Sequence, residues 1–161
     1  MDRPSQLNLD GAFPSRGLYA PTIRYHDGLF YVINTMVIGI TGNTNTQNDS
    51  ACQNFIVTAV HPAGPWSEPY WLDDAPGIDP SLFFDGDGRV WYTGNRIPPA
   101  GESYPGHREI WLQELNLETM QLTGEKYSLW DGAVKGNVHA EAPHLYKIDG
   151  MYYLMVAEGG T

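Results

Sequence analysis

Two carboxylates occupy comparable places in a pattern that recurs along the chain. Asp79 lies directly before Pro80, and Glu141 lies two residues before Pro143. Two carboxyl groups brought together can divide acid–base work, because the charge on one favours the protonated form of the other. An acid ahead of a proline is also a common turn former, so each residue alone is weak evidence of catalysis. Their shared position in the repeat makes them a candidate site.

The recurring pattern is an apolar strand, an Asp/Gly turn and a second, aromatic-rich strand. Its three copies, aligned on Pro21, Pro80 and Pro143, are 59 and 63 residues apart. The middle copy contains Asp85-Gly86-Asp87-Gly88, a strong hairpin signal because Asp and Gly tolerate positive φ. These four residues also resemble part of a calcium loop, but the downstream Glu of such a loop is not at the right spacing. A hairpin repeated at this period indicates a radial or stacked array.

The elements that position the two acids are therefore predicted to be all-β: a portion of a β-propeller made of four-stranded antiparallel blades, with very little helix. A blade usually takes about 40 to 50 residues, so this period fits blades with long loops. The polar segment 41–50 is predicted to be a loop. The predicted strands are 21–26, 29–37, 54–60 and 66–72 in a first blade (19–72), 80–84, 89–94, 109–115 and 126–130 in a second (78–130), and the first two strands of a third (141–161).

The innermost strand of a blade begins near the central axis, so the residues just before the three prolines should gather around one cavity. These are Tyr19-Ala20, Ile78-Asp79 and Glu141-Ala142. Two and a half units do not close a ring, because propellers close with about four to eight blades. We therefore expect a fragment that lacks the first and the C-terminal blades, or a chain completed by a second copy. Open blade edges would favour self-association.

Charge and composition bear on partners and location. The chain has 9 Lys and Arg against 19 Asp and Glu, a net charge of -10. Without a basic stripe, neither nucleic acid nor a membrane surface is an expected partner. Cys52 is the only cysteine, no 18-residue apolar run occurs, and the N-terminus lacks a leader pattern; a cytoplasmic location is the resulting expectation. The five histidines lack metal-ligand spacing, so no metal or cofactor is predicted.

Several motifs, in order along nearly the whole chain, resemble glycoside hydrolase family 43, most closely its β-xylosidase and α-L-arabinofuranosidase branch. The main ones are Tyr19-Ala20-Pro21, Ile78-Asp79-Pro80-Ser81, Gly64-Pro65-Trp66-Ser67, Arg108-Glu109-Ile110-Trp111, Glu141-Ala142-Pro143-His144 and Ala157-Glu158-Gly159-Gly160-Thr161. The resemblance implies a five-bladed propeller and hydrolysis with inversion at the anomeric carbon. A central structural ion such as calcium is compatible with the complete propeller of this family, but no residue here matches a ligand for it.

The resemblance also implies roles for individual residues. Glu141 matches the general acid and Asp79 the carboxylate that tunes its pKa and orients it; the general base matches nothing here and would lie upstream. Tyr19 replaces the usual Trp at a sugar-stacking position, next to Ala20, and Ala142 replaces the usual Gly. Ile78 and Thr161 fall where the family lines its sugar pocket. His139, two residues before Glu141, is a candidate for the border of that pocket.

These roles agree with the chemistry of glycosidic cleavage, in which an acid protonates the leaving oxygen and a carboxylate activates water on the opposite face. In an inverting site the two groups stand roughly 6.5 to 9.5 Å apart. The predicted substrate is an oligosaccharide from xylan, cleaved at β-xylosidic or α-L-arabinofuranosidic bonds. The alternative is a non-catalytic propeller module that binds carbohydrate or protein.

Overall fold

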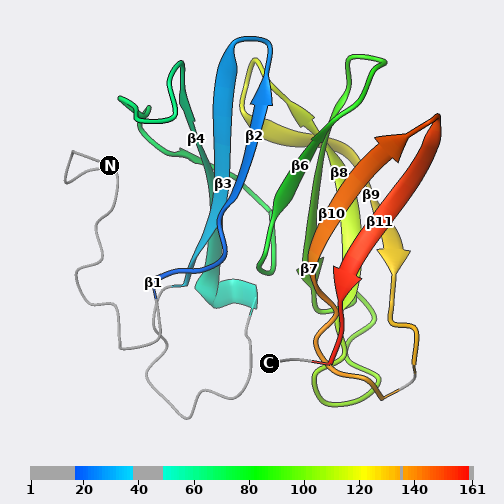
Figure 1. The fold of residues 1–161 in the computed structure, drawn as a ribbon. Coiled ribbons are helices and arrows are strands. Elements are labelled where there is room, and N and C mark those ends of the chain that lie inside the picture. The colour runs from blue at the N-terminus through cyan, green and yellow to red at the C-terminus, as the bar shows by residue number, and fades with distance from the viewer. Residues whose placement is uncertain (1–16, 38–48, 135, 160–161) are drawn as a thin grey trace.

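The computed structural model describes residues 17–37, 49–134 and 136–159. These residues form three antiparallel β-sheets, joined by turns and one short 3-10 helix, η2 (Asp49–Ala51). The all-β prediction is confirmed (Figure 1). Most of the predicted 41–50 loop lies outside the described residues, and its last two residues belong to η2.

The first sheet is a meander of β2 (Thr22–His26), β3 (Leu29–Val37), β4 (Cys52–Ala59) and β5 (Tyr70–Trp71). The prediction of β3 is confirmed residue for residue, and that of β4 within two residues. The prediction of β5 was too long, since only two residues of 66–72 pair with β4. Pro69 has no N–H to donate to a ladder, which interrupts the regular pairing, although the Ser67 N–H beyond it still donates to the Thr58 carbonyl of β4 at 2.8 Å.

A two-residue strand that the sequence did not reveal, β1 (Gly17–Leu18), completes this sheet. It pairs with the far end of β3, in the register Gly17 with Val37 and Leu18 with Met36. The first sheet therefore has five strands, where four were predicted. Because β1 pairs beyond the end of β2, the chain at Leu18 is brought to the same end of the sheet at which β2 begins.

The second sheet has four strands in sequential order: β6 (Ser81–Phe84), β7 (Val90–Arg96), β8 (Glu109–Asn116) and β9 (Gln121–Trp130). β9 begins five residues before the predicted 126–130, after a turn in which Asn116 Oδ1 accepts the backbone N–H groups of Glu118 and Thr119. The third sheet is the hairpin of β10 (Glu141–Ile148) and β11 (Met151–Ala157). Both hairpins that carry the candidate acids are thus confirmed as strands.

The main core lies between the first and second sheets. Ile33 and Ile56 from one sheet and Tyr92 and Trp111 from the other are all fully buried. Tyr92 and Trp111 also pack ring against ring, with centroids 4.9 Å apart. Burying side chains of this size contributes roughly 1.5 to 3 kcal/mol each, so the shared cluster of buried residues from the two sheets holds them face to face.

Three strands, one from each sheet (β2, β6 and β10), lie next to one another, because β6 contacts both β2 and β10 (Figure 1). The contact with β10 includes a buried hydrogen bond in which Ser81 Oγ donates to the carbonyl oxygen of Pro143, at 2.7 Å. Segments 62 residues apart in the sequence are thereby joined at the starts of their strands. The clustering of these strand starts agrees with the sequence prediction, while the blade boundaries 19–72, 78–130 and 141–161 stay predictions.

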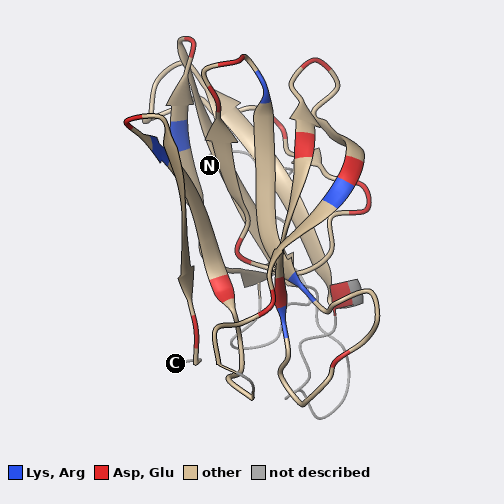
Figure 2. Cartoon of the chain, turned by 90° about the vertical axis from the view of Figure 1, so that its right-hand side faces the viewer, with Lys and Arg blue, Asp and Glu red and all other residues tan. Residues whose placement is uncertain are grey.

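Most Asp and Glu residues lie in turns and near strand ends, where Lys and Arg are fewer (Figure 2). No helix among the described residues is long and apolar enough to span a membrane.

Candidate active site

Asp79 lies on the short link that leads into β6, and the backbone of that link is tightly held. Asn95, buried at the end of β7, accepts the N–H of Ile78 through its side chain at 3.0 Å and donates its own N–H to the Ile78 carbonyl at 3.2 Å. Gly77 allows this approach: a Cβ there would lie 1.6 Å from the Asn95 carbonyl oxygen, and its φ is +89°. The residue before Asp79 is therefore fixed on both sides by one asparagine.

The first sheet holds the same link from the other side. The buried side-chain amide of Asn54 donates to the carbonyl oxygens of Ala75 and Gly77, at 2.7 and 3.1 Å. Its oxygen accepts a bond from Thr35 Oγ1 at 2.6 Å, and the Thr35 carbonyl accepts the N–H of Tyr19 at 2.9 Å. One polar network inside the first sheet thus positions both the link before Asp79 and the backbone of Tyr19.

Glu141 begins β10 and is brought to Asp79 by bonds between the second and third sheets. Asn95 Nδ2 donates to the Ala140 carbonyl at 3.3 Å, and the Ala142 backbone N–H donates to the Asp79 carboxylate. The pairing of β10 with β11 is shifted between Glu141 and His144, so the backbone is irregular where the acid projects. The prediction that Asp79 and Glu141 lie together agrees with this arrangement.

Three non-glycine residues at this site have left-handed backbone: Asp79 (φ 54°), His139 (φ 57°) and Ala142 (φ 49°). Asp and His adopt this conformation more readily than most residues, but alanine has no such tolerance, and the conformation costs it roughly 1 to 2 kcal/mol. At Ala142 the resemblance implied a glycine. The strained residue is the one whose N–H bonds Asp79, so the strain is stored where the two acids are linked.

Burial and the nearby charge of Glu141 together raise the pKa of Asp79 to about 6, against the opposing effect of the Ala142 N–H bond. The shift means that the ionised form of Asp79 is disfavoured in the folded chain. Asp79 and Glu141 thus form a pair of neighbouring carboxyl groups, one of which has a raised pKa. Such a pair has the properties of an acid–base site.

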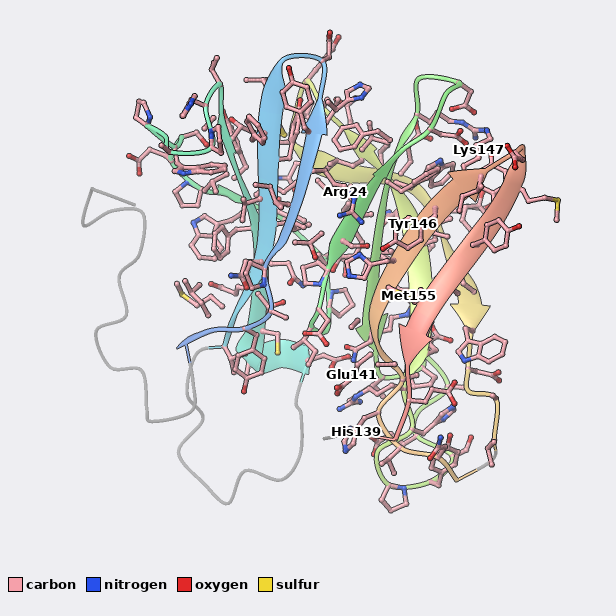
Figure 3. The ribbon with its side chains drawn as sticks, viewed as in Figure 1. Arg24, His139, Glu141, Tyr146, Lys147 and Met155 are labelled. Atoms are coloured by element: carbon pink, nitrogen blue, oxygen red, sulfur yellow. The ribbon has the colours of Figure 1, made fainter. Side chains whose placement is uncertain are left out.

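His139 lies beside the pair, at the end of the loop between β9 and β10. Its Nδ1 is 3.7 Å from Glu141 Oε1. Figure 3 shows the two side chains next to each other at the lower end of β10, and Lys147 at the upper end of the same strand. The sequence indicated His139 only as a border of the pocket, because the distance to Glu141 depends on the left-handed backbone at His139.

The other predicted site residues are placed unevenly. Tyr19 is half-buried and Ala20 exposed at the start of β2, while Ile78 is only 5% exposed and packs in the interior. Thr161 lies outside the described residues. The substrate-binding roles of Tyr19, Ala20, Ile78 and Thr161 stay predictions. Ile78 could contact a substrate only through the 5% of its surface that is exposed.

Buried or partly buried charged groups that the sequence did not single out as site residues lie at the end of β7 and beside it. Arg96 forms a buried ion pair with Glu109, at 2.6 Å, and stacks over the Trp111 ring. Asp49, on η2, accepts the N–H of Ile97 at 2.7 Å. Burial raises the pKa of Asp49, while Arg108 and Arg96 act in the opposite direction. The sequence offered one signal for these groups: Arg96 is a charged residue in an otherwise uncharged strand.

Within the described residues, no three His, Cys, Asp or Glu side chains are grouped closely enough to hold a metal ion. The described site consists of two carboxyl groups, a neighbouring imidazole and backbone N–H donors.

The family model of glycosyl hydrolases family 43 matches residues 1–161. The chain belongs to this family. It is 55% identical, over its whole length, to a xylosidase/arabinosidase of Butyrivibrio fibrisolvens, and 37% identical to a non-reducing end α-L-arabinofuranosidase of Bacteroides ovatus. The crystal structure of a xylan β-1,4-xylosidase from Bacillus halodurans superimposes on 99% of the chain with a TM-score of 0.83 and 41% identity.

This family 43 chain spans only part of those relatives: 29% of the Butyrivibrio protein, 26% of the Bacteroides protein and 29% of the Bacillus structure. The family and its xylosidase/arabinosidase branch, as the sequence motifs indicated, are confirmed.

Proposed function

We propose that the protein is an inverting glycoside hydrolase that cleaves β-xylosidic or α-L-arabinofuranosidic bonds of xylan-derived oligosaccharides. The observation that carries the proposal is the coupled pair Asp79 and Glu141, held together from three sheets. Its relatives supply the substrate class: their names include xylosidase/arabinosidase and α-L-arabinofuranosidase.

In this proposal Glu141 is the general acid. It gives its proton to the glycosidic oxygen as the bond from that oxygen to the anomeric carbon breaks, and water adds to the opposite face of the sugar. Asp79, ionised near neutral pH, favours the protonated form of Glu141 before the reaction, since like charges in a shared site repel each other. The general base that takes the proton of the water is assigned to a carboxylate outside this chain.

The proposal extends to the architecture. The three sheets are parts of consecutive blades in a five-bladed propeller, and β2, β6 and β10 are the inner strands of those blades. The support is the contact of β6 with both neighbours and the superposition on part of a larger family 43 enzyme. Tyr19 would then border the same cavity as the two acids, with its ring available to stack on a sugar.

The decisive test is Glu141→Gln in the full-length protein, with hydrolysis of xylobiose and of an arabinofuranosyl xylo-oligosaccharide as the readout. Loss of general acid catalysis lowers the rate by about 10² to 10⁴-fold, with substrate binding retained. Glu118→Gln, at an exposed position in the turn between β8 and β9, is the matched control and should keep full turnover. NMR of the first-formed sugar reports whether the anomeric configuration is inverted.

Normal turnover by the Glu141→Gln enzyme would overturn the role of Glu141. Binding of xylobiose by the wild-type protein without any hydrolysis would favour the alternative, a propeller that only binds carbohydrate.

A further inference from the structure

One polar atom beside the acid pair has no hydrogen-bond partner among the described residues. The ring of His139 is about one-third exposed, with 34% of its side-chain surface open, yet its Nδ1 is buried and makes no hydrogen bond. The neighbour it faces is Glu141 Oε1, at 3.7 Å. A buried polar atom without a partner costs roughly 1 to 3 kcal/mol, so its presence here calls for a partner that binds in some state of the protein.

The separation from Glu141 is short enough to close. A hydrogen bond between nitrogen and oxygen needs about 2.7 to 3.2 Å, so a movement of roughly 0.5 to 1 Å by either side chain would form one. Hydrogen bonds of catalytic groups are often long without substrate and tighten in the complex. A bond between the two groups needs one proton, and when the facing carboxyl oxygen carries none, Nδ1 must carry the proton and donate it.

The backbone around His139 aims the ring and limits its movement. Its N–H donates to the carbonyl of Gly106 at 2.9 Å, and a Cβ at Gly106 would lie 3.0 Å from the Val138 side chain and 3.5 Å from the His139 ring. Behind it, the carboxylate of Glu158 accepts the N–H of Ala133 and binds the amide of Asn137. The loop before β10 is thus fixed at both ends, with His139 turned toward Glu141.

We propose that His139 is a positioning residue for Glu141: its Nδ1–H donates to Oε1 and leaves Oε2 to carry the proton that is transferred to the leaving oxygen. When that proton departs, the bond from Nδ1 becomes charge-assisted and stabilises the new carboxylate. Asp79 favours the protonated acid before the transfer, and His139 stabilises the product of the transfer. The inference rests on the proposed role of Glu141.

The test compares leaving groups in the full-length protein. His139→Ala should lower kcat on xylobiose, a poor leaving group that requires the acid, by about 10-fold or more. On 2,4-dinitrophenyl β-xyloside, whose leaving group departs without protonation, the same variant should lose less than about 3-fold. A purely structural defect would lower both rates together.

The conservative variant is His139→Asn, because its amide nitrogen falls near the place of Nδ1 and asparagine tolerates positive φ. It should return kcat on xylobiose to within about 5-fold of the wild type. Alanine is already present at positive φ in this chain, at Ala142 (φ 49°), so the alanine variant is expected to fold. His139→Gly, which has no strain at this φ, serves as a second variant without the donor.

Equal losses on both substrates, or no rescue by asparagine, would overturn the inference. So would full xylobiose turnover by His139→Ala in an enzyme that Glu141→Gln inactivates, and this outcome would leave the proposed function intact. Normal turnover by Glu141→Gln, in contrast, would remove the proposed function and the inference together.

Discussion

The two ends of the contact between β6 and β10 carry opposite electrostatics. At one end Asp79 lies beside Glu141, and burial with this like charge raises the pKa of Asp79 to about 6. Six residues further along each segment, Asp85 lies beside Lys147, at 2.7 Å, and accepts the Tyr152 hydroxyl at 2.6 Å. Hydrogen bonds from Lys147 and Tyr152 lower the pKa of Asp85 to about 2.

The contact of Asp85 with Lys147 stabilises the fold, whereas the contact of Asp79 with Glu141 does not. The Asp85 cluster satisfies its carboxylate with a cation and a hydroxyl, as expected where two sheets are joined. The Asp79 end brings two carboxylates together and adds a strained alanine, Ala142, which stability alone does not favour. Perturbed groups of this kind are concentrated at functional sites, so the comparison identifies the end of the sheets at which chemistry takes place.

The largest expected effect is a difference in turnover between variants at the two ends of the contact. Asp79→Asn should lower turnover on xylobiose by about 100-fold or more, because the charge that favours protonated Glu141 is lost. Asp85→Asn is the matched control, six residues away in the same segment, and should keep turnover within about 3-fold while lowering the midpoint of denaturant unfolding. Equal losses of turnover in the two variants would show that the ends do not differ in function.

The next effect concerns the asparagine that joins the acid-bearing segments. Asn95 is 1% exposed and bonds the backbone of Ile78 and Ala140. Asn95→Ala leaves these buried groups without partners and should lower the free energy of unfolding by about 2 to 4 kcal/mol, measured by urea denaturation. Asn116→Ala, in an exposed turn, should cost about 1 kcal/mol or less. Similar losses would mean that Asn95 has no special part in joining the sheets.

The smallest effect is the pH dependence of stability, which should have opposite signs at the two ends. The pKa of Asp79 is raised from 3.8 to about 6 in the folded chain. Its contribution to the free energy of unfolding is therefore fully present below pH 3.8 and is lost as the pH rises toward 6. Its partial exposure reduces the cost of its charge to about 1 to 2 kcal/mol. Asp79→Asn should therefore be more stable than the wild type at pH 7, and the gain should vanish near pH 4.

Asp85 provides the opposite reference in the same denaturation series. The pKa of Asp85 is lowered in the folded chain, so its contribution to the free energy of unfolding is present above pH 3.8 and is lost as the pH falls toward 2. Asp85→Asn should be less stable than the wild type at pH 7, with the deficit persisting to about pH 4 and closing below it. A gain for Asp79→Asn that did not depend on pH would contradict the raised pKa of Asp79.

Local patterns in the sequence were enough to predict the strands that carry the acids. Alternation and Asp/Gly turns located β2, β3, β6 and β10, because strand faces and hairpin turns depend on neighbours a few residues away. They did not locate β1, since two residues carry no periodicity, and they overestimated β5. The same local reading placed Asp79 and Glu141 at equivalent strand starts and identified the family.

Contacts over long sequence distances were decided by the tertiary structure. The bond from Ala142 to Asp79, the bridge made by Asn95 and the approach of His139 to Glu141 each depend on how separate sheets pack and on left-handed backbone at single residues. The sequence by itself determined which residues could act as acids and which strands would carry them. Only packing decided how closely the two carboxylates would approach and how far each would be withdrawn from water, because proximity and desolvation, which shift a pKa, arise when the sheets come together.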